Sequence, residues 1–166
     1  MRKQAQVTIS TLARKVLLTD VRQRQHIEAC GLLTGSIDEQ ENWHVQRAHP
    51  LRNIFDSPVY FEFAPEDLLA IELDYPGQVI GAYHSHPAGI RVASSTDRAN
   101  MKRVNVEQQI PWVWLILCGP FAGVDPESAT WPEGASIIAY HHYTRQGLRQ
   151  VAIRFEPAAE ARPGPT

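Results

Sequence analysis

The sequence is short of cysteine, of long apolar runs and of basic residues, and each shortage excludes a class of protein. Cys30 and Cys118 are too few for a disulfide scaffold and form no C-x-x-C motif, so we expect a reduced, cytoplasmic compartment. The N-terminus leads into a polar strand rather than an apolar signal core, which argues against secretion. No apolar run approaches the roughly 18 residues of a membrane-spanning helix, so we expect no membrane partner.

The charge balance argues against a nucleic-acid partner. The chain has 16 Lys and Arg against 18 Asp and Glu, so there is no basic excess to displace counterions from phosphates. A content of 43% hydrophobic and 20% charged residues is typical of a folded protein. Its 166 residues fit one domain, which we place over residues 1–156. The Pro/Ala-rich tail, residues 157–166, is predicted to be disordered.

The order of periodic segments predicts an α/β fold, a single-domain mixed sheet flanked by helices. Helices are expected where apolar residues recur with helical spacing or follow a capping signal, and strands where they alternate or form short apolar runs. The predicted helices cover 10–24, 66–73 and 94 or 95 to 106. The predicted strands cover 28–35, 43–48, 60–63, 78–83 and 112–117, with a terminal hairpin of 137–144 and 148–155, and 119–134 is expected to be a loop.

The candidate metal-binding and catalytic residues are concentrated in the HSHP run at 84–87 and just after it. His84 and His86 are two residues apart, so on a strand their imidazoles point to the same face. Pro87 cannot donate to a sheet ladder, which places the pair at the end of that strand. Asp97 follows one loop later, in the first turn of the next helix. Two histidines and one carboxylate are a catalytic zinc set, with the fourth position left for water.

Each of these residues also has a purely structural interpretation. Ser94 and Asp97 have the spacing of a helix capping box, an interpretation compatible with metal binding by Asp97. His84 and His86 can be hydrogen-bonded strand histidines. Glu28, taken alone, is typical of a solvated carboxylate at a strand end. Cys30 and Cys118 are expected to be small buried apolar residues.

The motif as a whole resembles that of the JAMM (MPN-plus) zinc metallopeptidases, which is a distant Glu followed by H-[ST]-H-P-x6-S-x2-D. The run EACGLLTG at 28–35 is similar to the family's E-x-C-G-L-L-x-G strand, and Asn53 with FAPEDLL at 63–69 resembles the segment before its central helix. The similarity covers about residues 7 to 155. It implies a mixed sheet flanked by helices, of deaminase-like architecture.

The resemblance implies a role for each motif residue. His84, His86 and Asp97 would bind one zinc ion per chain, Glu28 would be the general acid/base, and Ser94 would help to hold the oxyanion. Family members with an inserted second zinc site differ from this chain, whose loop at 121–134 contains no Cys or His. A minimal prokaryotic member is therefore implied. A zinc nucleobase deaminase is excluded because its H-x-E and P-C-x-x-C pair is absent.

The resemblance implies a metallopeptidase that cuts the peptide or isopeptide bond after the C-terminal tail of a ubiquitin-like or sulfur-carrier protein. We expect that tail to end in Gly-Gly, to add a strand to a sheet edge and to contact the loops at 88–93 and 121–134. Two alternatives remain open at this stage: a zinc amidohydrolase acting on a small amide or amino-acid adduct, and a catalytically silent scaffold of the same family. The pathway and the oligomeric state are also open.

Overall fold

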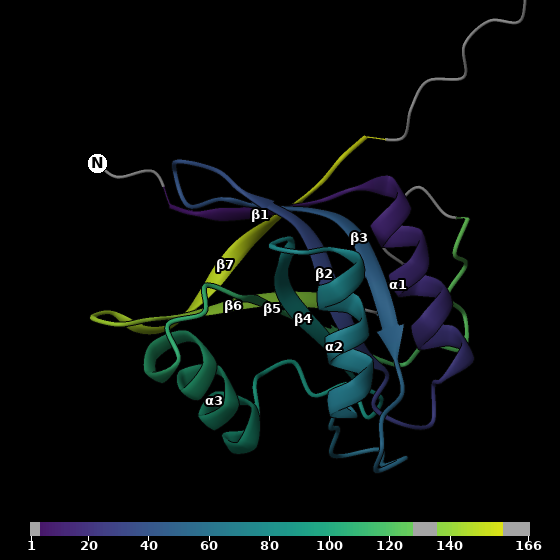
Figure 1. The fold of residues 1–166 in the computed structure, drawn as a ribbon. Coiled ribbons are helices and arrows are strands. Elements are labelled where there is room, and N and C mark those ends of the chain that lie inside the picture. Colours follow the sequence, from purple (N-terminus) through teal and green to yellow (C-terminus); the bar gives the residue numbers. More distant parts are fainter. Residues whose placement is uncertain (1–3, 128–135, 158–166) are drawn as a thin grey trace, which may run out of the picture.

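The computed structural model describes residues 4–127 and 136–157, and over them a seven-stranded mixed sheet closes on itself as a barrel with the strand order β1-β3-β2-β4-β5-β6-β7 (Figure 1). The strands are β1 (Gln6–Ile9), β2 (Cys30–Ile37), β3 (Trp43–Leu51), β4 (Val79–His86), β5 (Val113–Cys118), β6 (Ser136–Tyr143) and β7 (Gly147–Phe155). The helices are α1 (Thr11–Gln23), α2 (Pro65–Asp74) and α3 (Ser95–Lys102), with a π-helix, η1 (Arg103–Glu107), directly after α3. None of these helices has the length and apolar character needed to cross a membrane.

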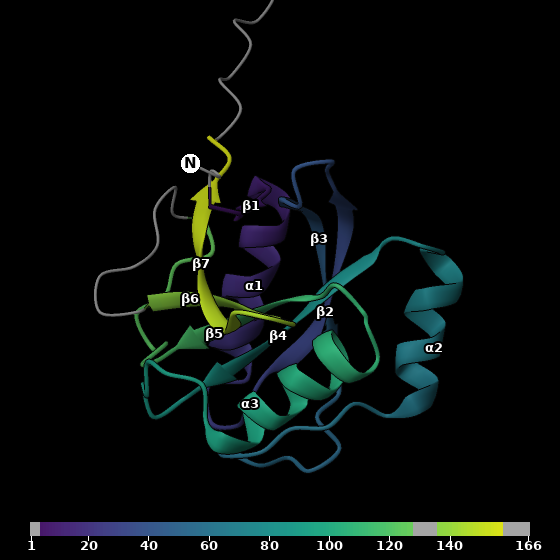
Figure 2. The same ribbon diagram turned by 90° about the vertical axis from the view of Figure 1, so that its left-hand side faces the viewer.

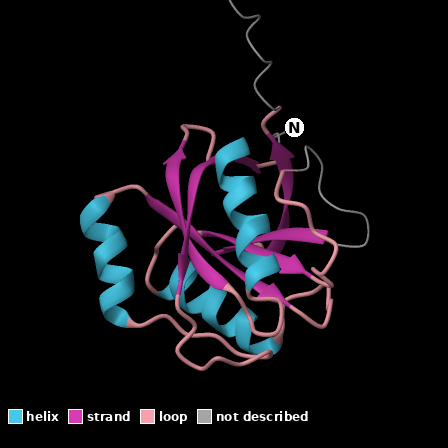
Figure 3. Cartoon of the chain, turned by 90° about the vertical axis from the view of Figure 1, so that its right-hand side faces the viewer, coloured by secondary structure: helices cyan, strands magenta, loops and turns pink. Residues whose placement is uncertain are grey.

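Helices cover both faces of the sheet, which confirms the predicted fold class. Strand β1 is parallel to β3 and β7, and β4 is parallel to β5, while the remaining pairs are antiparallel. Helix α1 buries Leu17, Leu18 and Val21 in one apolar cluster, and α3 with η1 buries Met101 and Val104 in a second. Figure 2 shows α3 in front of the sheet with α1 behind it, and α2 standing to one side (Figure 2, Figure 3).

The helix starts follow from local capping chemistry. The Ser10 hydroxyl accepts a hydrogen bond from the Ala13 amide at 3.0 Å and so caps α1. Helix α2 begins at Pro65, whose ring favours the first helical position, and Glu66 and Asp67 in its first turn complement the helix dipole. The sequence signals therefore locate the N-termini of these two helices correctly.

The strand predicted over residues 60–63 is wrong. The segment is extended, but it pairs with the turn around Asn53 instead of joining the sheet: the Asn53 side chain donates to the Tyr60 carbonyl at 2.9 Å and accepts from the Glu62 amide at 3.4 Å. Phe61 and Phe63 face the candidate site described below. The two-residue pattern therefore arises without the hydrogen bonds of a β-sheet. The described part of the expected loop, 119–127, contains no helix or strand, whereas nearly all of the predicted tail lies outside the described residues.

A buried ionic network joins α1 to the sheet. Asp20 is 5% exposed and accepts two hydrogen bonds from the Arg24 guanidinium, at 2.6 and 2.7 Å, together with one from the Tyr83 hydroxyl of β4 at 2.7 Å. Arg24 also donates to the carbonyls of Leu51 and Cys30. The buried charge is therefore paired, and the C-terminal end of α1 is tied to three strands.

Replacing Arg24 with methionine should destabilise the protein by about 3 kcal/mol, because Asp20 would keep a buried charge without its partner. Urea unfolding at pH 7 measures the loss. Arg22→Met, at an exposed position of the same helix, is the matched control and should change the free energy of unfolding by less than about 0.5 kcal/mol. Equal effects of the two substitutions would contradict the role of the network.

Candidate metal centre and active site

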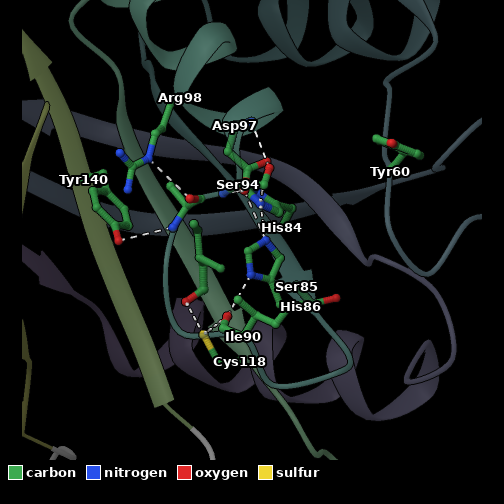
Figure 4. Close-up of polar contacts among 12 residues, drawn as sticks. Tyr60, His84, Ser85, His86, Ile90, Ser94, Asp97, Arg98, Cys118 and Tyr140 are labelled. Carbon is green, nitrogen blue, oxygen red and sulfur yellow. Dashed lines mark hydrogen bonds and ion pairs between the residues drawn. The ribbon is translucent and has the colours of Figure 1, made fainter.

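Strand β4 ends by turning two histidines toward α3. His84 and His86 face this side, while the alternate residues, Tyr83 and Ser85, bond to the α1 side of the sheet. The Nε2 atoms of the two imidazoles lie 3.2 Å apart (Figure 4). Both side chains are buried, at 1% and 8% exposure. The predicted placement of the pair at a strand end is confirmed.

The Asp97 carboxylate meets both imidazoles from the first turn of α3. Its Oδ1 lies 3.2 Å from Nε2 of His84, and its Oδ2 lies 3.1 Å from Nε2 of His86. The same Oδ2 accepts the Ser94 amide at 2.9 Å, while the Ser94 hydroxyl accepts the Asp97 amide at 3.0 Å. Ser94 and Asp97 thus form the capping box expected from their spacing, and the cap holds Asp97 against the histidines.

The site favours a neutral imidazole beside an ionised carboxylate. Burial lowers the pKa of His84. Burial acts to raise the pKa of Asp97, but hydrogen bonds from His84 and His86 outweigh it and hold that pKa well below its usual range. For His86, the bonds to Asp97 and to the Ile90 carbonyl outweigh desolvation and raise its pKa. The carboxylate is thereby held in its charged form.

These three residues can hold a metal ion. Their ligand atoms all lie within 4.8 Å of one another, and the chemistry of the set, two imidazole nitrogens and a carboxylate oxygen, is that of a catalytic zinc site. Nδ1 of His86 is bonded to the Ile90 carbonyl at 2.8 Å, which orients Nε2 toward the centre. Nδ1 of His84 has no protein hydrogen-bond partner among the described residues. Phe61 stacks on the His84 ring, with centroids 4.6 Å apart and planes 22° apart.

Glu28 lies next to this centre because β4 holds the chain just before β2. The Ser85 hydroxyl accepts the Ala29 amide at 2.8 Å, and the Ser85 amide donates to the Ala29 carbonyl. Asn53 donates to the Glu28 carbonyl at 3.1 Å. The Glu28 side chain is 5% exposed, and burial raises its pKa to about 8, while His86 lowers it and Asp97 adds to the rise. Its carboxyl is therefore buried, whereas Glu28 taken alone is typical of a solvated carboxylate.

A cleft of about 480 Å³ opens at this centre, with Glu28, Ser94 and Asp97 at one end. Tyr60 lies on the wall opposite Asp97 and Ser94 (Figure 4). The walls and floor of the cleft also include Phe61, Phe63, Leu68, Glu72, Thr96, Asn100, Arg103, Val104, Trp112 and Trp114.

The loop after the HSHP run is tied down beside the centre. Cys118 donates to the Ile90 carbonyl at 3.4 Å, and the Ala93 amide donates to the Tyr140 hydroxyl at 3.3 Å (Figure 4). Cys118 and Cys30 are both buried, and burial raises the pKa of both thiols, that of Cys30 to about 12, which disfavours a reactive thiolate at either position. Their predicted burial is confirmed.

Sequence reasoning missed Phe61 and Ser85, which support the centre without offering it a ligand atom. The two-residue alternation of 60–63 places Phe61 and Phe63 on one face, but it predicts a strand that the structure does not contain. Nothing in the residue types alone indicates that Ser85 reaches the segment carrying Glu28, because the contact joins positions 56 residues apart.

A family model described as prokaryotic homologs of the JAB domain matches residues 12–151. The chain belongs to this family. The match confirms the resemblance to the JAMM (MPN-plus) proteins. Among solved structures, the JAB-family chain is similar to protein DSY2949 from Desulfitobacterium hafniense, with a TM-score of 0.68 and 24% identity over 93% of this chain and 95% of that one. That likeness supports the fold.

Two curated relatives of this prokaryotic JAB chain are named desampylases. The one from Haloferax volcanii is 39% identical over 75 residues, which is 43% of this chain and 52% of the relative. The one from Pyrococcus furiosus is 36% identical over 94 residues, which is 55% of this chain and 59% of the relative. The chain thus aligns with just over half the length of each relative.

The three-residue centre should bind one divalent metal ion per chain. His86→Ala and Asp97→Ala should each lose most of it, because two remaining ligands hold an ion far less tightly than three. Elemental analysis of protein purified without added metal measures the content, and His44→Ala, which changes a strand histidine outside the centre, is the control. Full retention of metal by both site variants would contradict the ligand assignment.

In metal-free protein, burial of Glu28 should make stability fall as pH rises. The pKa of Glu28 is raised to about 8 from the ordinary carboxyl value of 4.5, so between these values the folded state binds a proton that the unfolded state has released. The destabilisation caused by ionising the buried Glu28 is absent below about pH 4.5 and is complete above about pH 8. Glu28→Gln should therefore gain stability over wild type across this interval, which urea unfolding at pH 5 and 8 measures. If the difference in unfolding free energy between Glu28→Gln and wild type is the same at pH 5 and pH 8, the prediction is contradicted.

Proposed function

We propose that the protein is a zinc metallopeptidase of the JAMM type that hydrolyses the peptide or isopeptide bond after the C-terminal tail of a ubiquitin-like or sulfur-carrier protein. The observation that carries the proposal is the buried Glu28 carboxyl beside the His84/His86/Asp97 group at one end of a cleft. Membership of the prokaryotic JAB family supports the hydrolase class. The relatives' name, desampylase, describes a deconjugating enzyme, which supports the substrate class.

Glu28 is assigned the proton transfers. Zinc, when bound by His84, His86 and Asp97, supplies Lewis-acid activation of water and of the scissile carbonyl. The Glu28 carboxylate takes the proton of the attacking water as the new C–O bond forms, and gives it to the amine nitrogen as the C–N bond breaks. Atoms and charge balance, with one water consumed per bond. Burial raises the pKa of Glu28, and a cation bound beside it would act in the opposite direction. A carboxyl whose pKa lies near neutrality both accepts and donates a proton readily.

Ser94 is assigned a hydrogen bond to the developing oxyanion. Its oxygen accepts the Asp97 amide, and that bond leaves the hydroxyl hydrogen to be donated into the cleft that Ser94 lines. One such donor contributes on the order of 3 kcal/mol to transition-state stabilisation.

The cleft, and not a sheet edge, is the better place for the substrate tail. Each described strand of the barrel has a neighbour on both sides, so the strand addition expected from sequence has no fully open edge to use. The metal-binding atoms lie deep, with His84 1% and Asp97 6% exposed, so a substrate backbone must approach closely. Glycine residues next to the scissile bond permit that approach, which supports a Gly-Gly tail.

The alternatives differ in a measurable way. A small-amide hydrolase would use the same centre but would ignore the protein part of the substrate, whereas a scaffold would bind metal without turnover. The cleft has a volume of about 480 Å³ and a lining that extends to Trp112 and Trp114, which favours an extended substrate over a small amide. The cytoplasm remains the proposed compartment.

The decisive experiment uses a ubiquitin-like or sulfur-carrier protein fused through its terminal Gly-Gly to a reporter. The zinc-loaded enzyme should cleave this fusion and should cleave the Ala-Ala version at least tenfold more slowly. Glu28→Gln should lose 100-fold or more in turnover with zinc content unchanged, the usual scale for general acid–base catalysis. Glu39→Gln, an exposed position in a turn, is the matched control.

Equal cleavage of the Gly-Gly and Ala-Ala fusions, or activity on small amides alone, would replace the proposal with the amidohydrolase. Stoichiometric zinc with no hydrolysis of any of these compounds would indicate the scaffold.

A further inference from the structure

Most of the cleft lies beyond the residues that the proposed function uses. Past Ser94 and Asp97, one wall is the face of α3 and η1 that carries Thr96, Asn100 and Arg103. The opposite wall is the 59–63 segment with Leu68 and Glu72 of α2. Between the walls lie two indole rings, Trp112 and Trp114. A large part of the lining at this end is apolar, although it is continuous with the catalytic end.

The two rings form a defined floor. Trp114 is 5% exposed and Trp112 is half-buried. Their centroids are 5.5 Å apart, and the planes meet edge to face at 63°. Val104, 7% exposed, and Ile110, 36% exposed, line the cleft beside them. A partly open aromatic surface of this kind favours an apolar side chain, since its burial removes apolar area from water on both partners.

Asn105 holds this floor through four hydrogen bonds. Its side-chain amide donates to the carbonyls of Ile110 and Trp112, at 2.9 and 3.0 Å. Its oxygen accepts the Trp114 indole N–H at 3.0 Å and the His142 amide of β6 at 3.0 Å. An asparagine side chain has two donors and two usual acceptor positions, so its capacity is filled. Both tryptophans are therefore positioned by one side chain that is itself 8% exposed.

The π-helix makes this arrangement possible. Helix α3 ends at Lys102, and the chain continues as η1 over Arg103–Glu107 with Asn105 at its middle. A π-turn adds one residue to the helical repeat, which changes the direction of the following side chains, and such turns are frequent at functional sites. Here Arg103 and Val104 line the cleft, while Asn105 bonds to β5, β6 and the chain entering β5.

The sheet register sets the distance between this floor and the catalytic end. His84 lies beside Ile116 of β5, so Trp114 comes two residues earlier on that strand, and Trp112 directly precedes the strand. At about 3.3 Å per residue, Trp114 lies roughly 7 Å from the level of His84. The Trp112 ring lies beyond it, with its centroid 5.5 Å from that of Trp114. We consider an extended peptide whose scissile bond lies at the metal centre. The fourth residue before that bond would then lie between Trp114 and Trp112. Two glycines at the first two positions would leave that fourth residue to contact the floor.

We propose that Trp112 and Trp114, positioned by Asn105, form a subsite for an apolar side chain at the fourth residue before the scissile bond. The proposal rests on the proposed function and deepens it, because it makes the substrate tail an extended chain with an aliphatic residue two positions before Gly-Gly. Asn105 is a positioning residue that acts through the two rings.

Binding of short peptides tests the subsite without turnover. The probes are N-terminally labelled Leu-Ala-Gly-Gly and Ala-Ala-Gly-Gly with free carboxyl ends, titrated into the zinc-loaded Glu28→Gln protein by fluorescence anisotropy. The Leu peptide should bind about tenfold more tightly, from the apolar area that it buries. Adding Trp112→Ala should reduce the ratio to within about twofold. Adding Tyr75→Ala, a half-buried aromatic outside the cleft lining, should leave it unchanged.

Asn105→Asp tests the positioning role. The substitution keeps the side-chain shape but places a carboxylate oxygen against the carbonyls of Ile110 and Trp112. In the otherwise unmodified enzyme, KM for reporter peptides with the Leu tail should rise about tenfold, to the value for the Ala tail, while kcat changes less than twofold. A merely destabilising effect would leave the ratio of the two KM values intact, and that result would overturn the role of Asn105. If the variant fails to fold, the Trp112→Ala result decides the subsite alone.

The outcomes separate this inference from the proposed function. Equal affinity for the two peptides in the Glu28→Gln protein overturns the subsite, even where Gly-Gly fusions are cleaved. A tenfold preference that is lost on Trp112→Ala supports the subsite, even where no Gly-Gly fusion is cleaved and the proposed function fails.

Discussion

The alternation of side chains along β4 is the constraint on which the rest of the structure depends. One face of its last four residues holds the fold together, because Tyr83 bonds to Asp20 of α1 and Ser85 bonds to the segment carrying Glu28. The other face carries His84 and His86 toward α3. A shift of register by one residue would exchange these roles and lose both. The same backbone therefore sets the positions of the two imidazoles and of the Glu28 carboxyl relative to each other.

Asp97 gives the site its charge and its rigidity at once. The carboxylate caps its own helix through the Ser94 amide and meets two imidazoles with its two oxygens. Such a group is costly to bury unless hydrogen bonds satisfy it, and here they hold its pKa well below the usual range. Among residues 4–127 and 136–157, Glu28 has no comparable set of donors, so burial raises its pKa instead. Two carboxyls in one site are thus driven in opposite directions, which suits one to binding a cation and the other to moving a proton.

The agreement between sequence and structure depends on how local each signal is. The capping box at Ser94, Pro65 at the start of α2 and the strand positions of His84 and His86 were all predictable, since each rests on contacts within a few residues. The strand prediction for 60–63 is wrong because alternation indicates which side chains are buried and not which groups bond to the backbone. Here the Asn53 side chain, and not a neighbouring strand, bonds to the backbone of this segment. The π-helix after α3 has no sequence signal of its own, because its direction depends on Asn105 reaching β5 and β6.

By itself, the sequence determined the kind of chemistry: the spacing of two histidines, a serine and an aspartate limits which atoms can meet, since strand and helix periodicity are properties of the local chain. Only the tertiary structure decided where Glu28 lies, how deeply it is buried and what lines the cleft beyond it. Those features arise from contacts between residues far apart in the chain, such as Ser85 with Ala29 and Asn105 with His142. Desolvation, which sets the pKa of Glu28, is a property of the packed surroundings and has no counterpart in the linear sequence.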